Sequence, residues 1–381
     1  MAQTFDVCIR GAGVVGRTLA LLLAGGRLRV ALVAPPARPA QEDVREDVRA
    51  YALNAASRAL LESVRGWPDA QHATAVRQMQ VQADQDGAVH FDAAQQDSDA
   101  LAWIVDVPAL EARLAEAVRY QPLVEAVEAP VAAPLTVVCE GRASRTRAEF
   151  GVEFDVTPYA QHAIATRLVC EQPHGQAARQ WFLADGGILA FLPLEGAQGN
   201  SVAVVWSVPQ ERATEWLHAD DDTFIHHLHE ASRGALGTLR MSAPRASWPL
   251  QQAQARHWCG LVPGQARQAR QAWALAGDAA HNVHPLAGQG LNLGLADAQA
   301  LARVLHAREP WRALSDPRPL RRYERERKAA LLPMGLVMDS LQQLFTRRES
   351  ALAALRNWGM KGFERSGPLK HWVARQAMGA R

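Results

Sequence analysis

The residues best suited to chemistry lie in a glycine-rich stretch late in the chain, residues 277–292, which reads GDAAHNVHPLAGQGLN. An apolar run at 272–276 precedes it and is typical of a buried strand, and a periodic apolar segment at 293–305 is typical of a helix. A loop between a strand and a helix start presents free backbone N–H groups and the positive end of a helix dipole. The stretch predicts a binding loop for a large polar ligand, with a tight surface turn as the alternative.

A second glycine motif, GAGVVG at residues 11–16, lies close to the N-terminus. It stands between a predicted strand and a predicted helix, and a further apolar strand follows at 28–33. In such a unit Gly11 permits the tight turn, Gly13 lets the backbone approach a pyrophosphate, and Gly16 lets helix and strand pack closely. The context predicts a βαβ unit that binds a dinucleotide.

The end of the second predicted strand lacks a group that such units usually have. An Asp or Glu there accepts hydrogen bonds from the ribose hydroxyls, whereas this chain has Ala34 followed by two prolines. Loss of that acceptor weakens binding by about 1–3 kcal/mol unless another group replaces it. Glu42 and Asp43 lie just downstream and are the candidates for replacement.

Other segments must position these loops. Arg49 precedes a predicted amphipathic helix, where it either meets a phosphate or another edge of a bound cofactor or is a solvated charge at the helix entry. Pro108 is suited to the first turn of a predicted helix. Only about fifteen residues separate the end of that helix from a strand predicted near residue 135, which is too few for a full β-meander. Alternating stretches between residues 151 and 208, and at 79–91, predict an antiparallel sheet. Its aromatic residues line a ligand or, as the alternative, pack in an ordinary core.

Composition limits the class of protein. A chain of 381 residues with 48% hydrophobic and 21% charged residues is expected to form two globular domains. A net charge of +2 does not indicate nucleic-acid binding. The four cysteines have no CxxC spacing, which disfavours disulfides and zinc and favours a reducing compartment. No cleavable signal stretch is visible in residues 1–10, so we expect a cytoplasmic protein.

The last part of the chain is basic and helical in pattern. Residues 318–381 hold fourteen Lys or Arg against five Asp or Glu, and helices are predicted at 323–330, 332–345, 352–358 and 368–377. A basic region of this kind either meets an anionic membrane surface or acidic partner, or is a solvated helical face. A histidine cluster at 226–229 is interpreted as helix surface, and no metal site is predicted.

Taken together, the motifs resemble those of the FAD-dependent aromatic monooxygenases. The resemblance lies in GxGxxG at 11–16, Arg49-Ala50-x-Ala52-Leu53, and GDxxHxxxPxxGQGxNLGxxD at 277–297. Narrower marks are similar to the bacterial ubiquinone-biosynthesis hydroxylases (the UbiH/UbiF/VisC group): EQPH at 171–174, LAFLPL at 189–194, VWS at 205–207, and DSL…LF at 339–345. The resemblance covers nearly the whole chain.

The resemblance implies a fold and a set of sites. The fold class is α/β: a discontinuous Rossmann-like FAD-binding domain (1–76, 100–150 and 258–330), an antiparallel β-sheet substrate domain (77–99 and 151–257), and a C-terminal helical region (331–381). Expected FAD-binding residues are Gly11, Gly13, Val14, Val15, Gly16, Arg49, Asp278, Pro285, Gly288, Gln289, Gly290, Leu291 and Asn292. Expected substrate-lining residues are Phe191, Pro193 and Trp206, with an apolar channel between residues 151–208 and the flavin. No catalytic residue is assigned.

The same resemblance implies the reaction. NAD(P)H reduces FAD, O₂ forms a flavin C4a-hydroperoxide, and its distal oxygen attacks a phenolic ring, here that of a polyprenylated ubiquinone precursor. Partners are the lipophilic substrate, other quinone-biosynthesis proteins and a membrane contacted peripherally. Two alternatives stay open: a hydroxylase of a small soluble aromatic, and a scaffold subunit that binds FAD weakly. Ala34 motivates the scaffold, as does the family motif DGxxSxxR, which is interpreted here as beginning with Glu140 and having its Arg moved forward to Arg145.

Overall fold

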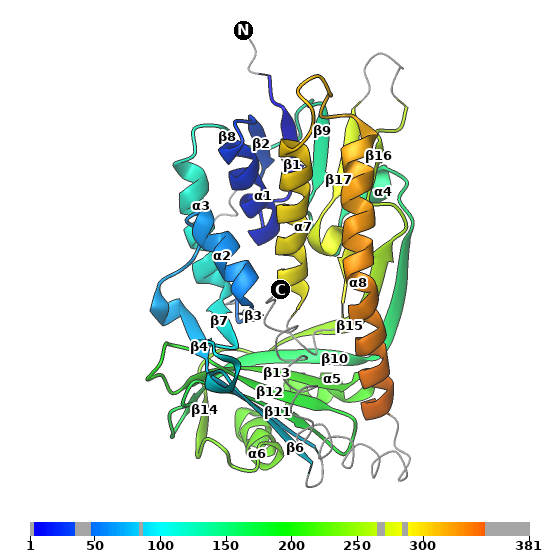
Figure 1. Ribbon diagram of the computed structural model, residues 1–381. Coiled ribbons are helices and arrows are strands. Elements are labelled where there is room, and N and C mark those ends of the chain that lie inside the picture. Colours follow the sequence, from blue (N-terminus) through cyan, green and yellow to red (C-terminus); the bar gives the residue numbers. More distant parts are fainter. Residues whose placement is uncertain (1–3, 35–46, 84–86, 265–270, 284–288, 347–381) are drawn as a thin grey trace.

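The structure is a computed structural model that describes residues 4–34, 47–83, 87–264, 271–283 and 289–346. Figure 1 shows two halves, with a helix-covered sheet in the upper half and a larger sheet in the lower half. The long helix α8, Pro317–Thr346, runs down one side from the upper half to the lower sheet.

The upper half is built on a six-stranded sheet with the order β16-β17-β9-β1-β2-β8. Its strands are β1 Val7–Arg10, β2 Val30–Val33, β8 Val124–Val127, β9 Leu135–Val138, β16 Cys259–Leu261 and β17 Ala272–Leu275. All neighbours pair in parallel except β16, which is antiparallel to β17. Strands from both ends of the chain therefore belong to one sheet, with β9 between them. The predicted Rossmann-like α/β fold is explained by the short apolar runs of β1, β2, β9 and β17, which are largely buried, whereas the edge strands β8 and β16 are more exposed.

Helices cover this sheet and form its core with it. They are α1 Val14–Gly25, α2 Ala55–Ser63, α3 Val107–Arg119, α4 Arg145–Glu149 and α7 Gly290–His306, together with α8. One apolar cluster joins the strands to α1, α3, α7 and the first half of α8. Residues 317–346 form one continuous helix, where the sequence predicts separate helices at 323–330 and 332–345. The helices predicted at 352–358 and 368–377 lie outside the described residues.

The lower half is a nine-stranded sheet, with the order β18-β15-β10-β13-β12-β11-β5-β6 and β14 paired to β10. Its strands are β5 Gln78–Gln82, β6 Ala88–Asp92, β10 Phe154–Cys170, β11 Ala177–Phe182, β12 Ile188–Pro193, β13 Ser201–Pro209, β14 Leu239–Met241, β15 Ala246–Ala255 and β18 His281–Asn282. Every pair is antiparallel except β11 with β5. Two helices, α5 Gln210–His218 and α6 Asp221–Ala231, pack beneath it (Figure 1).

A small three-stranded sheet, with the order β3-β7-β4, connects the two halves. Its strands are β3 Ala50–Leu53, β4 Ala73–Val76 and β7 Ala102–Asp106. Val76 and Ile104 of this sheet pack against Ala178 and Ala203 of the nine-stranded sheet. The connection between β8 and β9 contains no hairpin, as the short spacing predicts. The domain boundaries given above stay a prediction.

Candidate functional site

A cleft of about 510 Å³ lies where the two halves meet. Its walls come from the start of α1, from β3 and α3, from the end of β9, from residues 248–251 of β15, and from the segment that joins β17 to α7. The two glycine motifs therefore face one cavity, although more than half of the chain separates them. We call the side formed by Gly13 and Arg49 the α1 end, and the side formed by residues 276–278 and the first turn of α7 the α7 end.

The glycines of the first motif have different surroundings. Gly11 has φ +115°, and a Cβ there would overlap the carbonyl of Cys139, so only glycine fits. A Cβ on Gly16 would overlap the carbonyl of Gly11, which explains the close packing of α1 on β1. At Gly13 nothing lies within 4 Å of a Cβ position, and this residue lines the cleft. Gly13, the glycine that the motif predicts to lie next to a pyrophosphate, therefore has free space beside it on the cleft side.

Both helices that point at the cleft begin without a side-chain cap. Gly13 precedes Val14 and Val15 at the start of α1, and Gln289 precedes α7; neither cap residue accepts a backbone N–H of its helix through a side chain. Neither helix has an acidic residue in its first turn. The free N–H groups and the helix dipoles consequently direct positive potential into the cleft from two sides.

The α7 end is held by a buried ion-pair network that sequence reasoning missed. The Asp297 side chain is fully buried (0% exposed) and accepts hydrogen bonds from the backbone N–H of Gly277 (3.0 Å), His281 Nε2 (2.6 Å) and Arg327 Nε (2.6 Å). Burial alone would raise the pKa of Asp297, but the His281 and Arg327 partners outweigh it and lower that pKa. The His281 ring stacks on Trp258 at 5.0 Å. This network fixes the loop from β17 and ties α8 to it.

Asn292 uses its side chain within the protein. Its Oδ1 accepts from the Asn54 N–H (3.0 Å) and the Ser57 hydroxyl (2.7 Å), and its Nδ2 donates to the Ala52 carbonyl (2.8 Å). The predicted cofactor-binding role is thereby left to its backbone, while the side chain clamps α7 to β3 and α2. Gly290 and Leu291 line the cleft. Pro285 and Gly288 lie outside the described residues, as do Glu42 and Asp43.

Asp278 directly follows Gly277 and lies on the wall of the cleft with its side chain open to solvent. The protein groups that crowd this wall desolvate the carboxylate and raise its pKa, and Asp297 adds to the effect, while His281 and Arg142 oppose it. Such a carboxylate is placed to accept hydrogen bonds from the hydroxyls of a ligand.

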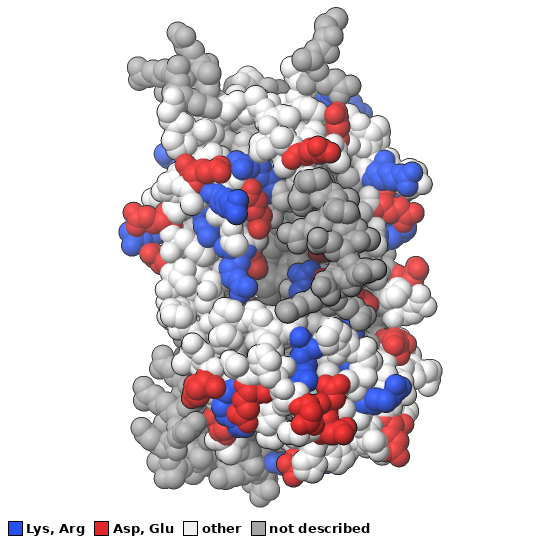
Figure 2. Space-filling model, turned by 180° about the vertical axis from the view of Figure 1, so that it is seen from behind, with Lys and Arg blue, Asp and Glu red and all other residues white. Residues whose placement is uncertain are grey.

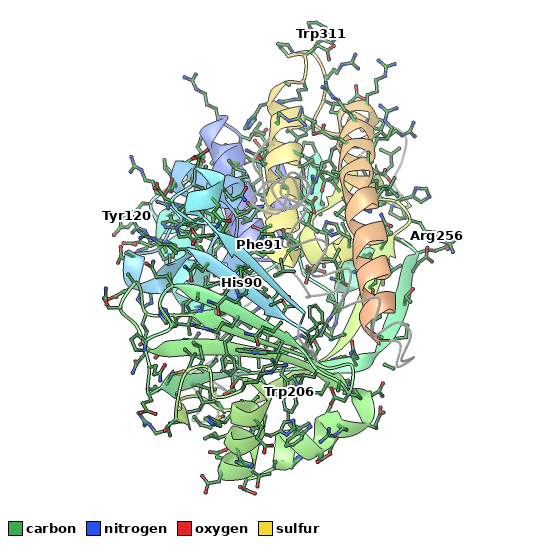
Figure 3. The ribbon with its side chains drawn as sticks, turned by 60° about the horizontal axis from the view of Figure 1, so that its bottom comes forward. His90, Phe91, Tyr120, Trp206, Arg256 and Trp311 are labelled. Carbon is green, nitrogen blue, oxygen red and sulfur yellow. The ribbon has the colours of Figure 1, made fainter. Side chains whose placement is uncertain are left out.

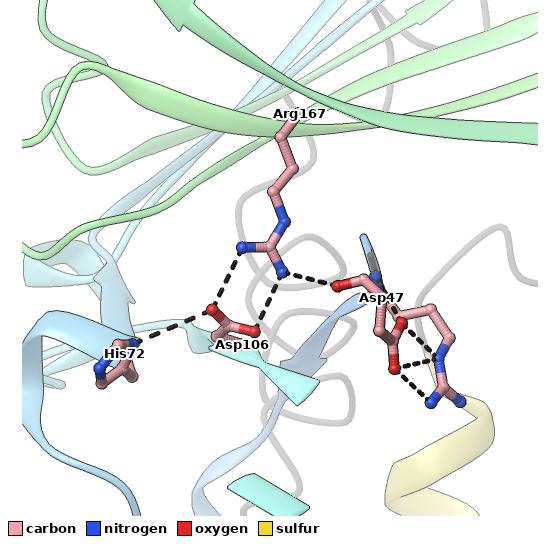
Figure 4. A network of polar contacts seen from close by, with 5 residues as sticks. Asp47, His72, Asp106 and Arg167 are labelled. Carbon is pink, nitrogen blue, oxygen red and sulfur yellow. Dashed lines mark hydrogen bonds and ion pairs between the residues drawn. The ribbon is translucent and has the colours of Figure 1, made fainter. Parts of the chain in front are cut away.

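Arg49 lies at the α1 end and belongs to a chain of polar contacts that crosses between the two halves (Figure 4). Its Nε donates to Asp47 Oδ1 (2.8 Å) and its Nη2 to Asp47 Oδ2 (2.6 Å). The Asp47 carbonyl accepts from Arg167 of β10 (3.3 Å), which also forms a two-pronged pair with Asp106 of β7. The nine-stranded sheet therefore reaches the α1 end through Arg167.

Glu140 is well accommodated where the family motif has Asp. It accepts from Ser144 Oγ (2.8 Å), from the N–H and Oγ1 of Thr146 (3.1 and 2.5 Å), and pairs with Arg10. The interpretation that the motif's arginine had moved to Arg145 was wrong. Arg147 keeps the family spacing after Ser144, is buried, and donates to the carbonyls of Ala279 and Arg142. The motif thus links the end of β9 to the α7 end of the cleft.

The predicted substrate-lining residues lie on the face of the nine-stranded sheet that turns away from the cleft. Phe191 and Trp206 are fully buried against α5 and α6, where Trp206 contacts Trp216 at 5.1 Å (Figure 3). Pro193 pairs with Val202, which belongs to the same buried face. Side chains alternate along a strand, so the opposite face is formed by the neighbouring positions. That face presents Ala165 of β10, and Trp248 of β15 lines the cleft.

At the end of β2, Ala34 leaves the ribose position without a carboxylate, and its N–H donates to the Val127 carbonyl.

Among the described residues, no group of three metal-ligating side chains comes together. His227 of the histidine cluster stacks on Trp216 at 4.4 Å. Within the same described part of the chain, no helix combines the length and the apolar character that crossing a membrane requires.

Comparison with known proteins settles the family. A model described as "FAD binding domain" matches residues 115–332. The chain belongs to this FAD-binding family. It is 30% identical over 404 residues to the 3-demethoxyubiquinol 3-hydroxylase of Escherichia coli (strain K12), covering 99% of both chains. It is 28% identical to the mitochondrial ubiquinone biosynthesis monooxygenase COQ6 of Drosophila melanogaster, over 99% of this chain and 90% of that one.

The fold is shared with solved structures of other proteins. The p-nitrophenol 4-monooxygenase PnpA from Pseudomonas putida DLL-E4 has a TM-score of 0.75 at 18% identity, with 100% of both chains covered. A variant of HpxO from Klebsiella pneumoniae, solved in complex with FAD, has a TM-score of 0.71 at 14% identity over 98% of both chains. The predicted family, fold class, FAD cofactor and flavin-dependent hydroxylase class are confirmed.

Proposed function

We propose that the protein hydroxylates the phenolic ring of a polyprenylated quinone precursor, with NAD(P)H as transient reductant. The observation that carries the proposal is a cleft, lined by both glycine motifs, in a chain that matches a ubiquinol-precursor hydroxylase from end to end. FAD bound in this cleft supplies electron transfer from the nicotinamide and activation of O₂. The protein supplies binding, orientation and exclusion of water.

The residues present fit FAD. Gly13, Gly141 and Gly290 line the cleft, and at each of them a Cβ position has no neighbour within 4 Å, so the glycines keep space that a bound group fills. The start of α1 and the Arg49 guanidinium are suited to the pyrophosphate. The start of α7 is suited to the pyrimidine edge of the flavin, where negative charge develops on reduction. Asp278 is suited to the ribityl hydroxyls.

The face of the nine-stranded sheet that adjoins the cleft suits an apolar ring. Val48, Ala165 and Ala243 form an apolar cluster against which Trp248 packs, and Leu250 continues this wall into the cleft. Apart from Trp248, the side chains of this cluster are small, in contrast to the larger aromatic cluster on the far face. We propose that the substrate ring lies between Trp248 and the flavin, with the prenyl tail leaving along the sheet.

The test compares substrates on the purified enzyme. We expect a yellow protein with near-stoichiometric flavin that incorporates isotopically labelled oxygen from O₂ into a prenylated phenol, with NAD(P)H consumption coupled to product. A phenol without the prenyl tail should react with a much higher KM. Equal turnover of the two phenols would favour the soluble-aromatic alternative, and a colourless protein that cannot be loaded with FAD would favour the scaffold.

We also propose that the protein contacts an anionic membrane surface through α8. Four exposed arginines at helical spacing form what we call the arginine face: Arg318, Arg321, Arg322 and Arg325. Within the described residues, none of the four forms an ion pair through its side chain. Trp311, 79% exposed just before α8, points away from the body (Figure 3). Leu332, 67% exposed and seven residues after Arg325 in α8, extends the face. The rear of the molecule, by contrast, has acidic and basic groups interspersed (Figure 2).

An arginine near an anionic bilayer contributes about 1 kcal/mol, so four of them suffice for measurable binding. In a sedimentation assay with phosphatidylglycerol-containing vesicles, the wild-type protein should therefore be found in the pellet with the vesicles. A variant with all four arginines changed to Gln should stay in the supernatant. A control variant removes the same charge elsewhere, at Arg65, Arg77, Arg119 and Arg240. Equal release of both variants would contradict a specific arginine face, and retention on neutral vesicles would point to an apolar contact instead.

A further inference from the structure

Among the described residues, two carboxylates lie close to Arg49 at the α1 end of the cleft. Arg49 Nη2 lies 2.6 Å from Asp47 Oδ2 and 3.7 Å from Glu111 Oε1. Asp47, Arg49 and Glu111 are all partly exposed (33%, 44% and 36%), and Arg49 and Glu111 line the cleft together. The side chains of Asp47, Arg49 and Glu111 together carry one net negative charge at the place where a dianionic pyrophosphate would approach Arg49, and the charge of Arg17, which lies beside Glu111, offsets part of it.

The two carboxylates have different supports. Asp47 holds Arg49 in place: it also accepts the Arg49 backbone N–H (3.1 Å), and its own carbonyl is fixed by Arg167. Glu111 lies on α3 and reaches Arg49 only at 3.7 Å, beyond hydrogen-bond distance, while its backbone carbonyl accepts from Arg17 (3.4 Å). Loss of the Glu111 charge would therefore leave the orientation of Arg49 intact.

We propose that Glu111 weakens FAD binding by competing with the cofactor pyrophosphate for Arg49. A carboxylate a few ångströms from a phosphate costs binding energy, since the cleft excludes part of the water that would screen it. The other charged residues of the cleft wall, Arg142 and Asp278, offset each other. The inference rests on FAD occupying this cleft and adds a residue that sets how tightly FAD is held.

The experiment measures FAD binding to apoprotein by quenching of flavin fluorescence. Glu111→Gln keeps the shape of the side chain and removes its charge, and we expect its Kd for FAD to fall by about three- to tenfold. The control is Glu116→Gln on the same helix, where Glu116 is exposed and pairs with Arg113. Its Kd should equal that of the wild type.

Arg49→Met provides a second comparison. If Glu111 acts by competing for Arg49, the gain from Glu111→Gln should shrink when Arg49 is already Met. ADP gives a third comparison, because it carries the pyrophosphate without the flavin. A lower inhibition constant of ADP in Glu111→Gln than in the wild type supports the assignment to the pyrophosphate, and equal constants would contradict it.

The outcomes separate this inference from the proposed function. Wild-type protein that binds FAD while Glu111→Gln binds it equally well or more weakly would overturn the inference alone; weaker binding would mean that Glu111 accepts a cofactor hydroxyl. Absence of FAD binding by both proteins would overturn the inference and the proposed function together. Matching thermal melts of the two variants exclude a folding defect as the cause.

Discussion

At the α7 end of the cleft, Asp297 is fully buried among three donors, whereas at the α1 end Arg49 holds its carboxylates in contact with solvent. A buried charge that loses a partner is costly, because water cannot replace the lost contact, while an exposed pair contributes little to stability. The difference separates two properties: the α7 end determines whether the loop is formed, and the α1 end determines how strongly an anionic ligand is attracted.

The largest effect on stability is expected for Arg327→Met at the α7 end. Arg327 is 10% exposed and donates to Asp297, so its removal leaves a buried carboxylate with one cationic partner fewer. We expect a loss of about 3 kcal/mol in the free energy of unfolding, measured by urea titration. Arg325→Met on the same helix, at an exposed position, should change it by less than about 0.5 kcal/mol. Similar losses in both variants would mean that helix α8 itself, rather than the network, carries the effect.

At the α1 end, Arg49→Met should leave stability within about 0.5 kcal/mol of the wild type, because the Arg49–Asp47 pair is exposed. Its Kd for FAD should rise by about tenfold, since a charge-assisted contact to the pyrophosphate is lost. Isothermal titration of apoprotein gives the Kd. Arg113→Met, an exposed arginine of α3 paired with Glu116, is the matched control. A variant that loses stability instead would show that the α1 end is structural as well.

Glu140 lies between the α1 end and the α7 end of the cleft, because it follows β9, and β9 lies between β1 and β17 in the sheet. Burial alone would raise its pKa, but hydrogen bonds from Thr146 and Ser144 and the charge of Arg10 hold it below the ordinary 4.5. A carboxyl group with a lowered folded pKa stabilises the fold above pH 4.5, and that contribution is lost as the pH falls through 4.5 toward the folded value.

Glu140→Gln should accordingly lower the free energy of unfolding by about 1–2 kcal/mol at neutral pH, with a smaller difference from the wild type near about pH 3. Denaturant titrations across this range measure it. Glu149→Gln provides the control, because Glu149 pairs with the same Arg10 but is exposed, so we expect little change at any pH. A difference that stays constant with pH would attribute the loss to packing rather than to the charge.

The parts that could be predicted from the sequence are those that depend on neighbours along the chain. The glycines of residues 11–16 and the strand–loop–helix order around residue 277 are local patterns, and the family motifs indicated the cofactor. The face of Trp206 was not predictable in this way, since a strand of alternating apolar residues fits either register and long-range pairing selects one. The partners of Asn292 and Asp297 were missed because they lie on elements distant in the sequence.

The smallest expected effect, Gly290→Ala, tests whether the α7 end can be changed in affinity without a change in fold. Gly290 is the first residue of α7, lines the cleft, and has open space around a Cβ position. Alanine restricts the unfolded chain, so stability should rise by about 0.5 kcal/mol, while the added methyl group occupies cofactor space and raises the Kd for FAD a fewfold. Gly25→Ala at the end of α1, equally open but outside this cleft, should share the gain in stability and leave the Kd unchanged. An unchanged Kd in Gly290→Ala would mean that bound FAD does not approach the start of α7, and the positive potential there would then serve another anionic group.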